Sequence, residues 1–253
     1  MSKLLSHPLG VFVVAVVVQW LRAFIGDLLG RKVRTVETAE RGDFSTVIAA
    51  TLTLLALIVG FTFSMAISRY DQRKNYEESE ANAIGTEYVR ADLLPAANAA
   101  KVRELLEKYL KQRVLFYQGR DESQLSQVNV EMTKLQTELW SAVVQPAEAQ
   151  PTPTMALVVS GMNDVLNSRG YTQAAWWNRI PHEAWELMGL IAFFANLLLG
   201  YGERRTNTSI LFVLPVMVSF SFALIADIDS PRGGIVRVLP QNLIALSQSI
   251  RGP

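Results

Sequence analysis

The residues able to do catalytic or metal chemistry are few in this chain. It has no cysteine, which excludes disulfides, thiolate catalysis and thiolate metal sites. Its two histidines, His7 and His182, each lie at the mouth of an apolar segment, and neither has a carboxylate at the spacing of a metal site. An interfacial polar role is the simpler explanation for both. We therefore expect no enzyme activity and no cofactor.

One pair of acidic residues, Asp227 and Asp229, could offer oxygens to a cation. Calcium takes six to eight oxygen ligands, and two carboxylates supply too few of them. The pair is a weak candidate for a metal site. A capped, solvated helix end is the simpler explanation, and we expect no bound metal.

Threonine and serine interrupt the apolar segment at residues 47–67. Thr53, Leu57 and Phe61 are four residues apart, so they share one face of a helix. Such a face could pack against a neighbouring helix, and hydroxyls in membrane spans commonly bond to the carbonyl four residues back. Repeated around a ring of subunits, the same face would form a narrow pore with a hydrophobic neck. Spacing alone favours packing over the pore.

Four apolar segments are the elements that must position this face. They cover residues 8–25, 47–67, 184–201 and 210–228. Each has about the 17–25 residues that a helix needs to cross the hydrocarbon core. Half of all residues are hydrophobic and the mean hydropathy is +0.19. The first segment lacks the small-residue cleavage site of a signal peptide, so we expect it to be retained as a span.

About 110 polar residues separate the second and third spans. Apolar residues at helical spacing predict helices over residues 69–94, 96–117, 125–144 and 154–166. Pro95 is expected to end the first, residues 146–153 to form a proline-rich break, and Thr154 to cap the last. Because their apolar faces need each other, we expect a small helical bundle. The predicted fold is an all-α integral membrane protein, with four transmembrane helices and a bundle inserted between the second and third.

These elements divide the chain into four parts. The predicted parts are a first transmembrane hairpin (1–68), the helical bundle (69–180), a second hairpin (181–229) and a C-terminal tail (230–253). Near the spans, six Lys and Arg residues lie on the side of the connectors and eight on the side of the bundle. This small excess leans toward a cytoplasmic bundle and cytoplasmic termini. Trp176, Trp177 and Trp185 are typical of an aromatic belt at the membrane boundary.

Net charge and resemblance to a known family limit the classes of partner that the chain is expected to bind. A formal charge of +1 gives no case for nucleic acid. The run GFTFS, residues 60–64, and the following Arg69-Tyr70-Asp71 resemble the end of the second helix of bestrophin anion channels. Ser64 and Arg69 stand three and eight residues after Phe61, as in that family, although the Tyr-Asp pair follows the arginine instead of preceding it. Residues 226–233 are similar to the family's acidic segment after the fourth helix, with Arg232 in place of a phenylalanine.

Longer phrases resemble a bestrophin-like family of bacterial membrane proteins more specifically. They are GFTFSMAISRYD, EANAIGTEYVRADLLP and IADIDSPRGG, and this resemblance covers most of the chain. It implies a multi-pass protein of the bacterial inner (plasma) membrane, in a family whose function is largely uncharacterised. The more distant resemblance to bestrophin channels implies cytoplasmic termini. The partners implied by it are the lipid bilayer, further copies of the chain in a homo-oligomer, with a pentamer favoured, and inorganic anions such as chloride.

The bestrophin resemblance also implies roles for individual residues. The second helix lines the pore in that family, and its neck positions correspond to Thr53, Leu57 and Phe61. Thr53 departs from the large apolar residue of the true channels. Four further residues would line the pore or its inner mouth: Ser64, Ser68, Arg69 and Arg73.

The two arginines have an alternative explanation. At an inner mouth, Arg69 and Arg73 would raise the local anion concentration. They could instead pair with Glu77 and Glu80, and the four-residue spacing of Arg73 and Glu77 favours pairing.

Two functions follow from these observations. The first is an oligomeric ion channel, anion-conducting, whose second span lines the pore. The alternative is a non-conducting membrane scaffold or sensor whose helical bundle binds a protein or small ligand.

Overall fold

The structure, a computed structural model, describes residues 8–32, 40–202 and 208–251. His7 and parts of both connectors, residues 33–39 and 203–207, lie outside this description. The described residues form helices joined by turns and no strand, which confirms the all-α class. The chain divides into a first unit, Met1–Tyr70 with Arg179–Arg237, and a second unit, Asp71–Asn178 with Val238–Pro253.

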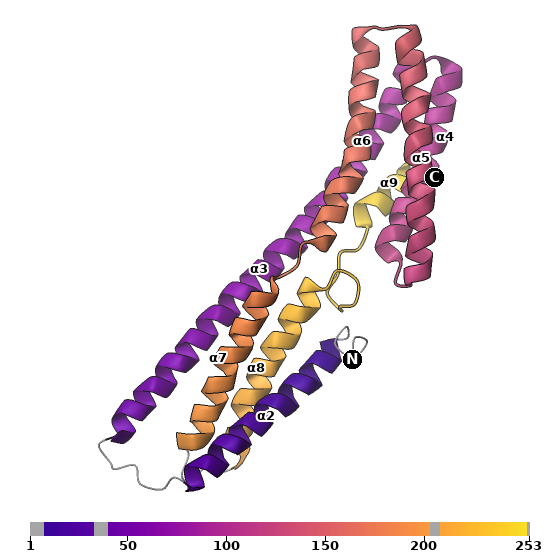
Figure 1. The fold of residues 1–253 in the computed structure, drawn as a ribbon. Helices are drawn as coiled ribbons and strands as arrows, with labels where there is room; N and C mark the ends of the chain where they lie inside the picture. The colour runs from indigo at the N-terminus through magenta and orange to yellow at the C-terminus, as the bar shows by residue number, and fades with distance from the viewer. Residues whose placement is uncertain (1–7, 33–39, 203–207, 252–253) are drawn as a thin grey trace. The chain divides into compact units, whose positions relative to one another are not determined.

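Four helical segments make up the first unit. They are α2 (Pro8–Lys32), the first part of α3 (Glu40–Arg90), α7 (His182–Gly202) and α8 (Thr208–Asp229). Helix α2 packs on α7 and α8, and α7 packs on α8 (Figure 1). Helix α3 joins them through Leu55, which is buried against Ala192 and Ala195 of α7 and Val218 of α8.

Helices α2 and α7 approach each other through glycine. A Cβ added to Gly26 would overlap the carbonyl oxygen of Leu197, and one added to Gly200 would overlap the carbonyl oxygen of Ala23. Small residues allow two helix backbones to come this close, which is how helices associate without a hydrophobic driving force in lipid.

A buried polar network ties the same helices together. The Asn196 amide of α7 donates to Oε1 of Gln19 in α2 at 2.8 Å. The Gln19 amide in turn donates to the Ser219 hydroxyl of α8 at 3.1 Å. Interhelical hydrogen bonds of this kind stabilise transmembrane packing.

Membrane-spanning length is present in three of the predicted spans. Among the described residues, three stretches are long and apolar enough to cross a membrane, within Gly10–Leu29, Phe44–Leu93 and Pro153–Tyr201. They contain the predicted spans at 47–67 and 184–201 and overlap the predicted span at 8–25 from Gly10 onward. The fourth predicted span, residues 210–228, forms helix α8, and its membrane crossing stays a prediction.

The second unit contains the rest of α3 and five further helices. These are η1 (Ala91–Leu93), α4 (Ala96–Gln118), α5 (Glu122–Ala149), α6 (Pro153–Trp177) and α9 (Gln241–Arg251). Helix α4 packs on α5 and α9, and α5 packs on α6 (Figure 1). The apolar positions expected to face the core, such as Leu106 and Tyr109 of α4 and Leu139 of α5, are buried.

The turn between α5 and α6 is shorter than the predicted proline-rich break. Helix α5 continues through Pro146. Helix α6 starts at Pro153, and its cap is Thr152, whose hydroxyl accepts a hydrogen bond from the Met155 amide at 3.2 Å. The prediction that Thr154 caps this helix was wrong. Proline suits the first helical position because its missing N–H would have no partner there.

Helix α6 also extends past the predicted end at Leu166. It runs to Trp177, because its buried face continues through Thr172 and Trp176. Trp176 packs against the rings of Phe116 and Tyr117 at centroid distances of 5.0 and 5.5 Å. The prediction of an aromatic belt was therefore wrong for Trp176, which belongs to the core of the second unit.

The C-terminal tail contains a helix that the sequence analysis missed. Helix α9 begins where Glu77 of α3 accepts two hydrogen bonds, from the Leu243 amide at 3.0 Å and the Asn242 side chain at 2.7 Å. A carboxylate at a helix N-terminus satisfies free N–H groups and favours the helix dipole. The buried side chains of Glu77 and Leu243 anchor α9 to the second unit.

Candidate functional site

The threonines of the second span use their hydroxyls within their own helix. Thr53 donates to the Ala49 carbonyl and Thr62 to the Ile58 carbonyl, each at 2.8 Å. This bond to the carbonyl four residues back satisfies the hydroxyl proton without a partner helix. The two threonines nevertheless lie on different faces of α3, because Thr53 is exposed and Thr62 is buried.

One face of α3 is buried in the first unit. Leu55, Thr62 and Ala66 are each at most 3% exposed. Leu55 and Ala66 belong to two apolar clusters formed with α7 and α8. This face accounts for the packing that spacing alone favoured.

The opposite face of α3 carries the predicted neck residues and is exposed. Leu57 is 51% exposed and Phe61 is 62% exposed, and Thr53 is exposed as well. A Cβ added to Gly60, beside Phe61, would meet no atom within 4 Å. In the part of the chain that the structure describes, no helix covers Leu57 and Phe61. They are available to lipid, to another subunit or to an aqueous path; we call Thr53, Leu57, Phe61, Ser64 and Ser68 the α3 face.

The last two members extend the α3 face toward the end of the span. Ser64 and Ser68 are exposed and follow Phe61 by three and seven residues, which keeps them on the same side of the helix. Neighbouring Arg69 is half-buried. Among the described residues, its Nε and Nη1 atoms have no hydrogen-bond partner.

Arg73 lies apart from the α3 face. Its side chain is buried in the second unit, where Nε donates to the Ala175 carbonyl at 3.2 Å and Nη2 to the Asn178 carbonyl at 3.4 Å. These are carbonyls at the C-terminal end of α6, where a cation is favoured by the helix dipole. The sequence predicted Arg73 either at the inner mouth of a pore or in a pair with Glu77, and neither prediction included this contact with α6.

The two glutamates considered as partners for the arginines have other contacts. Glu77 accepts from α9, as described above. Glu80 pairs with Arg113 of α4, and both side chains are completely buried. Sequence reasoning missed both contacts, because residues 71–80 are almost all polar and give no local sign that Glu77 and Glu80 are buried.

Asp227 and Asp229 hold backbone in place. Asp227 accepts from the amides of Ile235 and Val236 at 2.7 and 2.8 Å. Asp229 accepts from the Ile180 amide at 3.1 Å, just before α7. Both side chains are buried. No group of three or more His, Cys, Asp or Glu that could hold a metal occurs among residues 8–32, 40–202 and 208–251.

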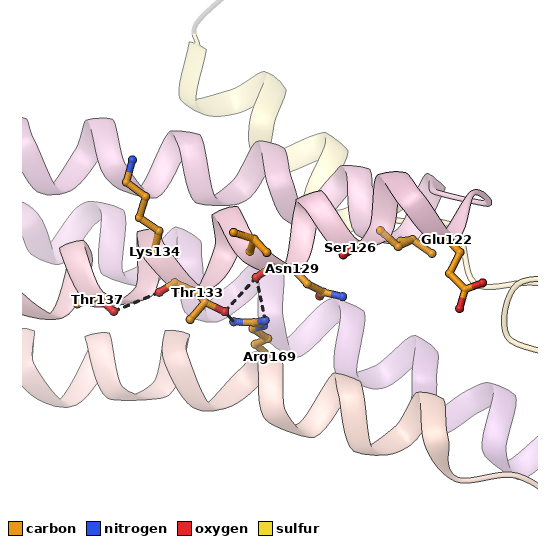
Figure 2. A pocket seen from close by; sticks show the side chains of 9 residues that line it. Glu122, Ser126, Asn129, Thr133, Lys134, Thr137 and Arg169 are labelled. Atoms are coloured by element: carbon orange, nitrogen blue, oxygen red, sulfur yellow. Dashed lines mark hydrogen bonds between the residues drawn. The ribbon is translucent and has the colours of Figure 1, made fainter.

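A shallow groove of about 770 Å³ lies over α5 and α6 in the second unit (Figure 2). Arg169 bridges the two helices there, donating to Gln136 Oε1 at 2.6 Å and to Thr133 Oγ1 at 3.3 Å. Thr133 and Thr137 donate to carbonyls of their own helix at 2.9 and 3.2 Å. The groove therefore has the charged residues Glu122 and Lys134 in its lining, and the side chains of Thr133, Thr137 and Arg169 are already hydrogen-bonded within the two helices.

Comparisons with solved structures identify the fold. The structure resembles that of a bacterial bestrophin homologue from Klebsiella pneumoniae, with a TM-score of 0.64 and 17% sequence identity over 94% of this chain and 95% of that one. A single-substitution variant of the same homologue gives a TM-score of 0.67, 15% identity and coverage of 94% and 93%. A second single-substitution variant gives a TM-score of 0.64 and 16% sequence identity, over 94% of this chain and 97% of that one.

Sequence comparison identifies the family. No curated protein sequence is significantly similar to the chain. The sequence profile of the Bestrophin-like domain, however, matches residues 10–243, nearly the whole chain. This match agrees with the resemblance carried by the motifs around Phe61 and Asp227. The chain is a membrane protein that belongs to the Bestrophin-like family.

Proposed function

We propose that the chain is one subunit of an oligomeric, anion-conducting channel, and that the α3 face lines its pore. The observation that carries the proposal is the exposure of Leu57 and Phe61 on a helix whose opposite face is buried. Helix α3 thus has one exposed and one buried face. In a member of the Bestrophin-like family, a ring of subunits whose α3 faces surround a common axis explains this arrangement.

The residues of the α3 face give the proposed pore two zones. Thr53, Leu57 and Phe61 would form the neck. The large apolar side chains of Leu57 and Phe61 would exclude water, and such a constriction gates by dewetting. The electropositive edge of the Phe61 ring can face a partly dehydrated anion. Ser64 and Ser68 would follow as a more polar zone, whose hydroxyls can donate to an anion.

Arg69 supports the anion assignment more directly than Arg73 does. Two nitrogens of Arg69 have no hydrogen-bond partner within the described residues, and this residue adjoins Ser68 at the end of the α3 face. Its positive charge would raise the local concentration of anions. Arg73, which is buried against carbonyls of α6, would contribute only through its charge.

The proposal includes four membrane spans and a cytoplasmic bundle in the bacterial inner membrane. The natural absence of cysteine makes this topology directly testable. Ser141→Cys places a single thiol on an exposed position of α5. Intact spheroplasts should protect this thiol from an impermeant maleimide, and permeabilised ones should not. Labelling in intact spheroplasts would place the bundle outside the cell.

The function itself is tested by current across a planar bilayer that contains the purified protein under a KCl gradient. A reversal potential near the chloride equilibrium value supports an anion channel. Reversal near the potassium value would keep a channel but overturn the anion selectivity. A pentamer, which we favour, is tested separately by the mass of the detergent-solubilised oligomer.

The second candidate function is a non-conducting scaffold or sensor. The groove over α5 and α6, with Glu122 and Lys134 in its lining, is where a partner of the bundle would bind. No current from folded, oligomeric protein would favour this candidate over the channel.

A further inference from the structure

The second unit contains a carboxylate for which the fold offers no hydrogen bond. Glu87, near the end of α3, has a side chain that is 0% exposed. Neither of its carboxylate oxygens has a hydrogen-bond partner among the described residues. A charged carboxylate in this environment carries a large desolvation cost, and protonation removes that cost.

Glycine in the facing helix makes room for this carboxylate. A Cβ added to Gly161 of α6 would overlap both Oε2 of Glu87 and Nη1 of Arg90. The two side chains of α3 therefore lie directly over the bare backbone of α6. Gly161 itself is buried, so the carboxylate is enclosed at the contact between α3 and α6.

Few charges act on Glu87. Arg90 of α3 favours the charged form, and Asp164, exposed one turn beyond Gly161 on α6, opposes it. Burial is the largest cause and raises the pKa of Glu87, Arg90 lowers it, and Asp164 raises it further; the net result is a rise from the ordinary value of 4.5 to about 8. Burial dominates because it acts against the carboxylate more strongly than Arg90 acts for it.

Charged groups of the neighbouring elements are bonded elsewhere. Asp92 of η1 pairs with Arg103 of α4. Glu107 of α4 accepts a hydrogen bond from the Tyr88 hydroxyl at 3.3 Å. These contacts leave Arg90 and Asp164 as the charges that act on the Glu87 carboxylate.

We propose that Glu87 is a proton-binding site and that its ionisation weakens the contact between α3 and α6 around Gly161. The packed form holds the proton, whereas an unfolded or opened form releases it to water. Proton binding at neutral pH thereby stabilises this contact, and alkaline pH loosens it. The proposal does not depend on whether the chain conducts ions.

The sign of the effect follows from proton linkage. Between about pH 4.5 and 8, the folded protein binds one more proton at Glu87 than the unfolded chain does. Stability from this group is therefore complete below pH 4.5 and falls as the pH rises to about 8. At higher pH Glu87 is ionised in both the folded and the unfolded protein, so stability no longer falls because of this group.

The test compares full-length wild-type protein with Glu87→Gln in thermal unfolding from pH 5 to pH 9. Glutamine keeps the shape of the protonated acid and cannot ionise. The melting temperature of wild type should fall relative to that of Glu87→Gln up to about pH 8 and then run parallel to it. The other residues are common to both proteins, so their contributions cancel in the difference. Glu148→Gln, at an exposed carboxylate of α5, is the matched control and should parallel wild type.

A second variant keeps the proposal testable if Glu87→Gln does not fold. Asp164→Asn removes an exposed negative charge that opposes ionisation of Glu87. The pH at which the fall in melting temperature ends should then move to a lower value than in wild type. Parallel curves for wild type and Glu87→Gln would overturn the proposal, and so would an unmoved end point in Asp164→Asn.

Discussion

Glu80 of α3 and Arg113 of α4 form an ion pair that is completely hidden from solvent inside the second unit. Nη2 of Arg113 donates to Oε2 of Glu80 at 2.9 Å, and Nε donates to the other oxygen. The hydroxyls of Tyr117 and Thr172 also donate to Glu80, each at 3.4 Å. Three helices, α4, α6 and α3, thus converge on one carboxylate.

Removing the cation from this pair should be strongly destabilising. Arg113→Met keeps much of the side-chain volume but leaves Glu80 buried without its counter-charge. The expected loss is about 3–5 kcal/mol of unfolding free energy, the usual cost of breaking a buried pair from one side. Thermal unfolding of the purified protein measures it.

Two companions test the cause of that loss. The double variant Glu80→Gln with Arg113→Met removes both charges and should recover much of the stability. Lys108→Met breaks the exposed pair with Glu104 on the same helix, and we expect no measurable change because surface pairs contribute little. Equal losses at Arg113 and Lys108 would contradict this explanation.

Attachment of the C-terminal helix should depend on Glu77. Glu77→Ala removes the acceptor of the Leu243 amide and of the Asn242 side chain. Hydrogen bonds to a charged group contribute about 1.5–3 kcal/mol, so amide exchange in α9 should become roughly 10- to 100-fold faster. Hydrogen exchange read by mass spectrometry over residues 241–251 measures this. Glu78→Ala, at the exposed neighbouring position, should leave α9 protected; equal exchange in both variants would mean that α9 is held by its apolar face alone.

The crossing of α2 and α7 should tolerate no side chain at Gly200. Gly200→Ala places a methyl group against the carbonyl oxygen of Ala23 and forces the two helices apart. Overpacking of this kind costs about 1–3 kcal/mol, visible as a lower melting temperature in detergent. Gly189→Ala, in the same helix with nothing within 4 Å of the added methyl, should instead be neutral or stabilising by up to about 1 kcal/mol. A stable Gly200→Ala protein would show that this close approach is not needed.

Local signals explain which parts of the fold could be predicted from the sequence. Helical spacing and segment length are properties of neighbouring residues, so the helices and the burial of Leu106 and Leu139 followed from them. The placement of Thr53, Leu57 and Phe61 on one helix face could be predicted in the same way, because residues four apart share a face in any α-helix.

Long-range contacts could not be predicted in this way. Glu77 bonds to Leu243, 166 residues further along the chain, and Arg73 to Ala175, 102 residues away. Spacing could suggest only the local pairing of Arg73 with Glu77. The short turn at Thr152 differs from the prediction for another reason. The prolines of residues 146–153 predict a break, whereas Pro153 starts α6.

The proposed neck makes a prediction that separates a pore from a lipid-facing surface. Leu57→Ala and Phe61→Ala each remove a large apolar side chain from the α3 face. In a neck that closes by dewetting, both should widen the constriction, admit water and raise the leak current at zero stimulus. Phe61→Ala should also shift the reversal potential under a KCl gradient if the ring faces the permeating anion.

The matched control for the neck is Phe220 of α8, which is 62% exposed, the same as Phe61. If Phe220 faces lipid, Phe220→Ala should leave both leak and selectivity unchanged, although it removes the same ring from an equally exposed position. Equal effects at Phe61 and Phe220 would attribute the change to general loosening of the spans. Unchanged current in both Leu57→Ala and Phe61→Ala would exclude a hydrophobic gate on the α3 face, because a constriction made by these side chains cannot survive their loss without a change in its hydration.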